Sequence, residues 1–234
     1  MEASRKGILM KVNLKVKRFD PDDSSGKTWW QEYNIDTHQD STVLDALIHV
    51  REYEDTSLAL RCACRASICG SCGMKVNGGA KLVCKTRVAD IAPNGNQIVI
   101  EPMGNHPVVK DLVVSLDTFF DQIKRVKPYL QPDHVPQSGE YVASNESMEN
   151  LLTPMNCIMC GCCVSDCTVL EVDDTFLGPA ALAKAYRFGY KITEIPEKWP
   201  IRRQGKSKFK YSSIFYYLPW YYYILFSNFK KNEK

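Results

Sequence analysis

The chain has no apolar run near its start that would serve as a secretory signal, because Met1 to Lys6 are mostly polar and charged. Its 234 residues are 44% hydrophobic and 24% charged, which excludes collagen-like, fully disordered and polytopic membrane proteins. Nothing in it resembles a catalytic triad, a phosphate-binding loop or a pair of catalytic carboxylates, and its four histidines are scattered. We therefore expect no catalytic residues of its own and no nucleic-acid partner.

The formal charge of +3 is the sum of two unlike parts. Residues 198–234 carry nine Lys and Arg against one acidic residue, whereas residues 1–197 carry 21 basic against 26 acidic residues. The tail is also aromatic, with ten Phe, Trp and Tyr between Tyr211 and Phe229. Such a segment suits a membrane interface, although it is short for spanning and contains Pro219. The alternative interpretation is non-native sequence.

Ten cysteines form two groups, which are separated by 72 residues without cysteine. In a chain without a secretory signal, reduced thiols that hold a cofactor are favoured over disulfides. The two groups therefore indicate two sites, one in each of two domains. The first comprises Cys62, Cys64, Cys69, Cys72 and Cys84, and the second comprises Cys157, Cys160, Cys162, Cys163 and Cys167.

The first group contains the spacing C-x4-C-x2-C with a distant fourth cysteine, given by Cys64, Cys69, Cys72 and Cys84. This is the plant-type arrangement for a 2Fe-2S cluster. The intervening residues are mostly small, as a loop that aims backbone N–H groups at cluster sulfurs requires. Zinc is the alternative, but zinc motifs usually consist of two close C-x2-C pairs, so we favour 2Fe-2S. Cys62 lies outside the pattern and is expected to pack as a small hydrophobe.

The second group contains the bacterial ferredoxin run C-x2-C-x2-C-x3-C, given by Cys157, Cys160, Cys163 and Cys167. Three closely spaced cysteines wrap one cubane, and the fourth ligates a neighbouring cluster in two-cluster ferredoxins. One run therefore implies a partner run, which the sequence does not contain. Cys162 stands between the ligands and is expected to face the core.

Hydrophobic periodicity predicts a small α+β domain followed by a mainly helical one. Residues 8–19 and 29–35 alternate like the strands of a hairpin, and Ser41 or Thr42 is placed to cap a helix over residues 43–50. The α+β domain is further predicted to contain a hairpin turn at 77–79, a returning strand at 82–84 and a strand at 97–101. The predicted helices that follow are one from 108 to 127 with Asp111 in its first turn, one at 148–152, one around the second cysteine group and one at 179–188.

At several motifs the sequence closely resembles the iron-sulfur subunit of succinate dehydrogenase/fumarate reductase. The motifs are residues 64–78, 107–113, 127–130, the second cysteine run, 176–181 and 185–188, and the resemblance extends over about residues 8–190. It implies an α+β fold in three parts. These are an N-terminal β-grasp 2Fe-2S ferredoxin domain (1–107), a C-terminal all-helical ferredoxin-like domain (108–190) and an atypical basic aromatic tail (191–234).

The resemblance further implies a role in electron transfer. In this family three clusters relay electrons between the FAD of a flavoprotein subunit and a quinone in a membrane anchor subunit. We expect a peripheral location on the cytoplasmic face of a prokaryotic cell membrane, because the chain has no transit peptide. The implied ligands are Cys64, Cys69, Cys72 and Cys84 for the 2Fe-2S cluster, Cys157, Cys160 and Cys163 for a 4Fe-4S cluster, and Cys167 for a 3Fe-4S cluster.

The sequence departs from the family pattern after Cys167, because no cysteine follows it. Three clusters need about eleven ligands and only eight positions match, so one 4Fe-4S ligand and two 3Fe-4S ligands are missing. Thr168 stands where a proline is common. Glu171 and Val172 stand where quinone-reducing members often carry tryptophan.

Three alternatives remain open. The first is the related iron-sulfur subunit of a thiol-dependent fumarate reductase, which shares these motifs. The chain is otherwise a soluble 2Fe-2S carrier, or a truncated product that holds only the 2Fe-2S cluster. Loss of the reading frame within residues 189–205 is our hypothesis for the missing cysteines, because the resemblance ends there and the tail is rich in Lys, Asn, Phe, Tyr and Ile.

Overall fold

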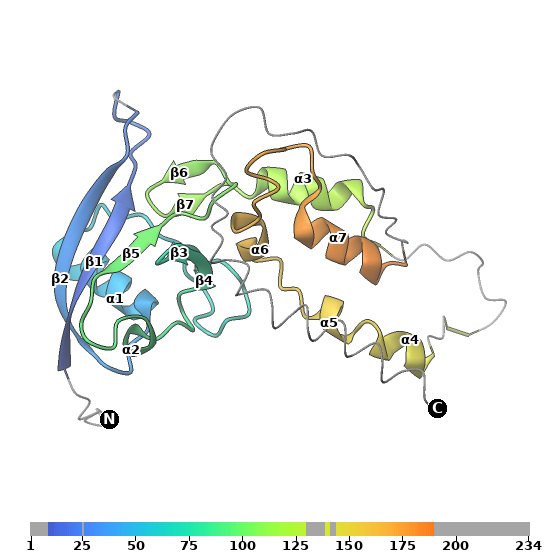
Figure 1. The fold of residues 1–234 in the computed structure, drawn as a ribbon, viewed down its shortest axis with the longest axis horizontal. Coiled ribbons are helices and arrows are strands. Elements are labelled where there is room, and N and C mark those ends of the chain that lie inside the picture. Colours follow the sequence, from blue (N-terminus) through green and yellow to red (C-terminus); the bar gives the residue numbers. More distant parts are fainter. Residues whose placement is uncertain (1–8, 25, 130–138, 141–143, 190–234) are drawn as a thin grey trace, which may run out of the picture. The chain divides into compact units, whose positions relative to one another are not determined.

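The computed structural model describes residues 9–24, 26–129, 139–140 and 144–189. The N-terminal part is built on a mixed five-stranded sheet with the strand order β2-β1-β5-β3-β4 (Figure 1). Its strands are β1 (Leu9–Arg18), β2 (Trp29–His38), β3 (Gly73–Val76), β4 (Gly79–Leu82) and β5 (Ile98–Glu101). β1 pairs antiparallel with β2 and parallel with β5, and alternate β1 side chains from Val12 to Val16 are buried. The predicted hairpin is confirmed.

Helix α1 (Val43–His49) packs into the same core as the sheet and begins at the predicted place. Thr42 caps it, because its hydroxyl accepts from Asp45 N while the Asp45 carboxylate accepts from Thr42 N. Leu44 and Leu47 are fully buried in this core. A π-helical turn (Val50–Glu54) follows directly, and the short α2 (Val88–Ile91) lies between β4 and β5.

The helix predicted from residue 108 to 127 is wrong over its first half. The chain instead forms the two-stranded hairpin β6 (Val108–Lys110) and β7 (Val113–Val114), and the helix α3 spans only Asp117–Arg125. Asp111 is 1% exposed and has φ 47° in the β6–β7 turn. Its carboxylate accepts from Arg18 Nε at 2.8 Å and from the backbone N–H groups of Phe19 and Ala59. These distant partners outweigh the local helical periodicity.

All the regular elements of the remaining described residues are helices, as predicted. They form α4 (Asn145–Glu149), α5 (Leu152–Met155), α6 (Cys162–Ser165) and α7 (Gly178–Arg187), with Pro179 in the first turn of α7. α3 and α7 lie side by side (Figure 1). Together with α6 they form a small apolar core from Phe119, Ile123, Val164, Ala180 and Ala181. No described helix is long and apolar enough to cross a bilayer. The aromatic tail and most of the proposed frame-loss region lie outside the described residues.

Candidate metal centres

The loop between the π-helical turn and β3 carries three of the four cysteines of the first predicted site. Cys64 and Cys69 are exposed, whereas Cys72 is 3% exposed at the start of β3. The predicted strand over residues 82–84 is wrong, because β4 ends at Leu82 and the next residues form a turn. This turn buries Val83 completely in the core and leaves Cys84 half-buried.

Backbone N–H groups of this loop point at its cysteine sulfurs. Cys64 Sγ accepts from the N–H groups of Ala66, Ile68 and Cys69, at N···S distances of 3.3, 3.4 and 3.3 Å. Cys69 Sγ accepts from Cys64 N at 3.5 Å. Donors aimed at sulfur stabilise thiolates, which are the form that ligates iron. The loop therefore fits a cluster of the predicted kind.

Two serine hydroxyls also contact cysteine sulfurs. Ser71 Oγ lies 3.1 Å from Cys69 Sγ, and Ser67 Oγ lies 3.7 Å from Cys84 Sγ. The hydrogen bond from Ser71, together with backbone N–H groups, lowers the pKa of the Cys69 thiol to about 6. Burial instead raises the pKa of the Cys72 thiol to about 11. The exposed Cys69 thiol thus loses its proton more readily than the buried Cys72 thiol.

The backbone of the loop is held in an uncommon conformation. Arg65, Ser67 and Gly70 have φ values of 53°, 59° and 73°. Only one of the three is glycine, and a positive φ costs other residues about 1–3 kcal/mol. Such strain persists where the surroundings require it and concentrates at functional sites.

The second cysteine group follows α5 and extends through α6. Cys157, Cys160 and Cys167 are half-buried, and Cys163 is exposed on α6. A hydrogen bond from the Cys162 side chain lowers the pKa of the Cys160 thiol to about 6, although burial opposes this. Cys162 itself is half-buried and lies against Gly73, consistent with a packing role.

The two cysteine groups touch through a glycine. Gly70 lies between Cys69 and Cys72, and a Cβ placed on it would be 2.7 Å from the Cβ of Cys160 and 2.8 Å from its Cα. A Cβ on Gly73, at the start of β3, would lie 3.3 Å from Cys162 Sγ. Only a residue without a side chain permits so close an approach. The structure therefore places the second run directly against the first cysteine loop.

Polar contacts fix α6 and the residues after it on the sheet domain. The Asp166 carboxylate accepts from Ala80 N at 2.8 Å, and Ser165 Oγ accepts from Gly104 N at 2.9 Å. The side-chain amide of Asn105 donates to the carbonyls of both Val164 and Cys167, at 2.8 and 2.9 Å. These bonds position the backbone around Cys163 and Cys167.

His106 packs beneath the second run. It is 7% exposed, its Nε2 lies 3.5 Å from the Gly161 carbonyl, and burial lowers its pKa. Its Nδ1 is the one buried side-chain nitrogen or oxygen without a hydrogen bond among the described residues. His106 is therefore a buried residue of the protein core.

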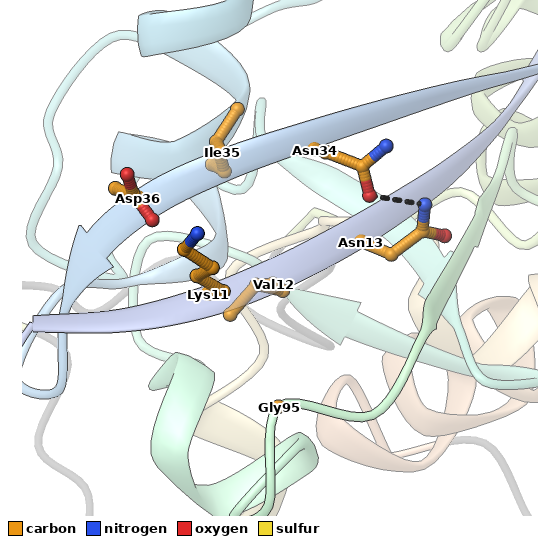
Figure 2. Close-up of a pocket in the computed structure, with 7 residues that line it drawn as sticks. All are labelled: Lys11, Val12, Asn13, Asn34, Ile35, Asp36 and Gly95. Carbon is orange, nitrogen blue, oxygen red and sulfur yellow. Dashed lines mark hydrogen bonds between the residues drawn. The ribbon is translucent and has the colours of Figure 1, made fainter.

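One hollow of the described part of the chain lies away from the cysteines. A hollow of about 330 Å³ over β1 and β2 is lined by amide, charged and aliphatic side chains (Figure 2), and its Asn13 amide donates to Asn34 Oδ1 at 2.9 Å. No three His, Cys, Asp or Glu side chains of the described part converge on a single metal position. A cluster spreads its ligands over several irons, so the cysteine loops remain the candidate sites.

The spacing of the cysteines predicts which of them are ligands, but it does not predict which residues contact their sulfurs. Ser67 and Ser71 were recognised only as small residues, although their place beside ligands is a usable signal for hydroxyl–sulfur contacts. Asn105 and His106 lie more than 50 residues from the backbone groups that they contact, so no local pattern identifies them.

Residues 13–121 match the family model described as "2Fe-2S iron-sulfur cluster binding domain". This match includes all four cysteines of the first site and defines the class: a protein with a 2Fe-2S-binding domain. The Mycobacterium smegmatis Sdh1 complex in the apo form contains a chain of similar fold, with a TM-score of 0.69 and 24% identity. The alignment covers 80% of this chain and 79% of that one.

The fumarate reductase iron-sulfur subunit of Mycobacterium tuberculosis (strain CDC 1551 / Oshkosh) is 37% identical over 183 residues, which is 77% of this chain and 73% of the relative. The chain therefore belongs to the family of iron-sulfur subunits of fumarate reductase and succinate dehydrogenase. These relatives are subunits of oxidoreductase complexes. The predicted family and the α+β fold class are confirmed.

Proposed function

We propose that this chain is the electron-transfer subunit that relays electrons between the FAD of a flavoprotein subunit and a quinone in a membrane anchor. The contact of Gly70 with Cys160 carries the proposal, because it brings the two cysteine groups together. Electron tunnelling slows steeply with distance, so a relay requires such proximity. The chain's task is to hold and insulate redox centres, while a flavin partner performs the hydride chemistry.

The first centre is a 2Fe-2S cluster on Cys64, Cys69, Cys72 and Cys84. When bound, such a cluster accepts and returns one electron at a time. The chain's own residues prepare the site: the N–H groups at Ala66 and Ile68 favour the Cys64 thiolate, and the core around Cys72 excludes water on one side.

The second run fits its clusters only in part. Cys157, Cys160 and Cys163 would hold three corners of a 4Fe-4S cluster, and Cys167 would supply one ligand to a 3Fe-4S cluster. Residues 168–234 contain no cysteine and so supply none of the remaining cysteine ligands. The division at residue 107 into two cluster-binding domains is part of the proposal.

Metal analysis with matched cysteine variants tests the assignment. The purified full chain should contain about two irons and two sulfides in the first centre, with a 2Fe-2S signal in electron paramagnetic resonance (EPR). Cys69→Ala should abolish that signal. Cys62→Ala is the control from the same segment, because Cys62 packs against the core instead. Loss of the signal in Cys62→Ala, or its survival in Cys69→Ala, would refute the ligand set.

Co-expression with a flavoprotein subunit tests the partner. We propose a complex at the cytoplasmic face of a prokaryotic membrane; the names of the two mycobacterial relatives support only that the chain is part of a multi-subunit complex. The tagged chain should retain a protein with bound flavin, and reduction of that flavin should reduce the 2Fe-2S centre. Failure to retain the flavoprotein, with the cluster intact, would contradict the relay but not the ligand assignment.

The missing cysteines favour a second candidate, a product that holds only the 2Fe-2S cluster. The two candidates differ in iron content. About two irons per chain with a 2Fe-2S signal alone supports the second candidate, whereas about nine irons supports three assembled clusters.

A further inference from the structure

Two side-chain hydroxyls contact the cysteine sulfurs of the first centre from different directions. Ser71 is two residues beyond Cys69 in the turn before β3, and its Oγ lies 3.1 Å from that sulfur. Ser67 is in the exposed part of the loop, and its Oγ reaches Cys84 Sγ, 17 residues away, at 3.7 Å. The Cys64 sulfur, in contrast, receives only backbone N–H groups among the described contacts. The serine contacts can therefore be removed by substitution.

We infer that Ser67 and Ser71 are positioning residues that raise the reduction potential of the 2Fe-2S cluster by donating hydrogen bonds to two of its cysteine ligands. The inference rests on the proposed function, which places the cluster on these cysteines. A ligating thiolate has no proton, so the hydroxyl must be the donor in each pair. Uptake of one electron increases the negative charge on the sulfurs, and a donated hydrogen bond stabilises the reduced cluster more than the oxidised one.

The distances rank the two residues. The Ser71 contact is the shorter, so its hydroxyl should have the larger effect. Ser67 has φ 59°, which glycine adopts without strain. On backbone conformation alone, glycine would be favoured over serine at position 67. Unlike glycine, serine at this position provides a hydroxyl that contacts the sulfur of Cys84.

A redox titration of the full chain, with dithionite as reductant and the EPR signal of the 2Fe-2S cluster as readout, tests the inference. Ser71→Ala should shift the midpoint potential to a lower value, and Ser67→Gly should shift it in the same direction by less. The double variant should show the sum of both shifts. Ser71→Thr keeps the hydroxyl and should restore the native potential. Ser115→Ala is the control, because the Ser115 hydroxyl bonds to Asp117 and not to a sulfur.

Two further comparisons separate the hydroxyl from the backbone. Ser67→Gly and Ser67→Ala both remove the hydroxyl but differ in backbone strain, so equal shifts support the hydrogen bond and unequal shifts overturn it. Electron–nuclear double resonance in H₂O and D₂O should show an exchangeable hydrogen coupled to the cluster that Ser71→Ala removes.

Native potentials in Ser71→Ala and Ser67→Gly, with the cluster intact, would overturn this inference and leave the proposed function standing. A native chain that assembles no 2Fe-2S cluster would overturn both.

Discussion

Substitution of Gly70 by alanine tests whether the contact between the two cysteine groups is built into the fold. The added Cβ would lie 2.7 Å from the Cys160 Cβ, about 0.7 Å closer than ordinary contact begins. Both neighbouring atoms belong to residue 160 near its backbone, so they cannot rotate away. Overpacking of this kind costs about 1–3 kcal/mol. The positive φ of 73° adds about 1–3 kcal/mol for a residue with a side chain.

Gly78 provides the matched control. It has φ 85° and nothing within 4 Å of an added Cβ, so Gly78→Ala incurs the backbone cost without the clash. The difference between the two variants therefore isolates the contact with Cys160, at about 1–3 kcal/mol. For a chain of this size each kcal/mol lowers the thermal midpoint by roughly 2–4 °C.

The assay is thermal unfolding of the full chain, followed by circular dichroism and by limited proteolysis within residues 157–167. Gly70→Ala should unfold below Gly78→Ala and should be cut faster in the second cysteine run. Equal midpoints and equal cleavage would refute the direct contact between the two groups.

The remaining predictions concern stability. Asp111→Asn should cost about 1.5–3 kcal/mol because it removes one of the two carboxylates that pair with the buried Arg18 guanidinium, while Asp55 remains as the other. Lys110→Ala, which removes a half-exposed pair with Asp20, should cost under about 1 kcal/mol. Urea unfolding measures both, and equal costs would contradict the buried pair. Asn105→Ala should cost about 1–3 kcal/mol because it removes both amide donors; the Val164 carbonyl keeps the Cys167 N–H, whereas the Cys167 carbonyl loses its Asn105 donor. The exposed Asn145→Ala should cost a few tenths of a kcal/mol, and a smaller loss in Asn105→Ala than in this control would refute that role. Burial lowers the pKa of His106, so the stability of the fold should decrease as the pH drops below about 6.5. In a plot of the urea midpoint against pH, His106→Phe should remove this decrease. Hydrogen bonds from Ser57, Tyr33 and Arg18 hold the pKa of Asp55 well below its ordinary value, although burial opposes this. The free energy of unfolding should therefore fall a second time as the pH drops below about 4, and Asp55→Asn should not show this second decrease.

The sequence predicted those helices and strands that are determined by residues within or next to them. The alternation of Val12, Leu14 and Val16 gave β1, Thr42 with Asp45 gave the start of α1, and Pro179 gave the start of α7. The cysteine spacings likewise identify candidate ligands, because the ligands of one cluster come mostly from one loop.

The segment after residue 107 shows where local patterns fail. Its apolar residues fit a helix by periodicity, but Asp111 pairs with Arg18, 93 residues earlier, and this buried pair fixes a turn at the predicted first helical turn. A buried carboxylate needs charged and backbone donors wherever they are in the sequence. No window of a few residues contains that information.

The same distinction explains the small residues of the first cysteine loop, which the sequence presents as one feature. Gly70 is small because the backbone of Cys160 lies against it. Ser71 and Ser67 are small for a different reason, since their hydroxyls must reach sulfurs within a crowded loop. Alanine would satisfy the size requirement at positions 67 and 71 but would supply no donor, and at position 70 even alanine is too large. A substitution series across these three positions therefore separates packing from electrostatics: position 70 should change stability, whereas positions 67 and 71 should change the cluster's potential.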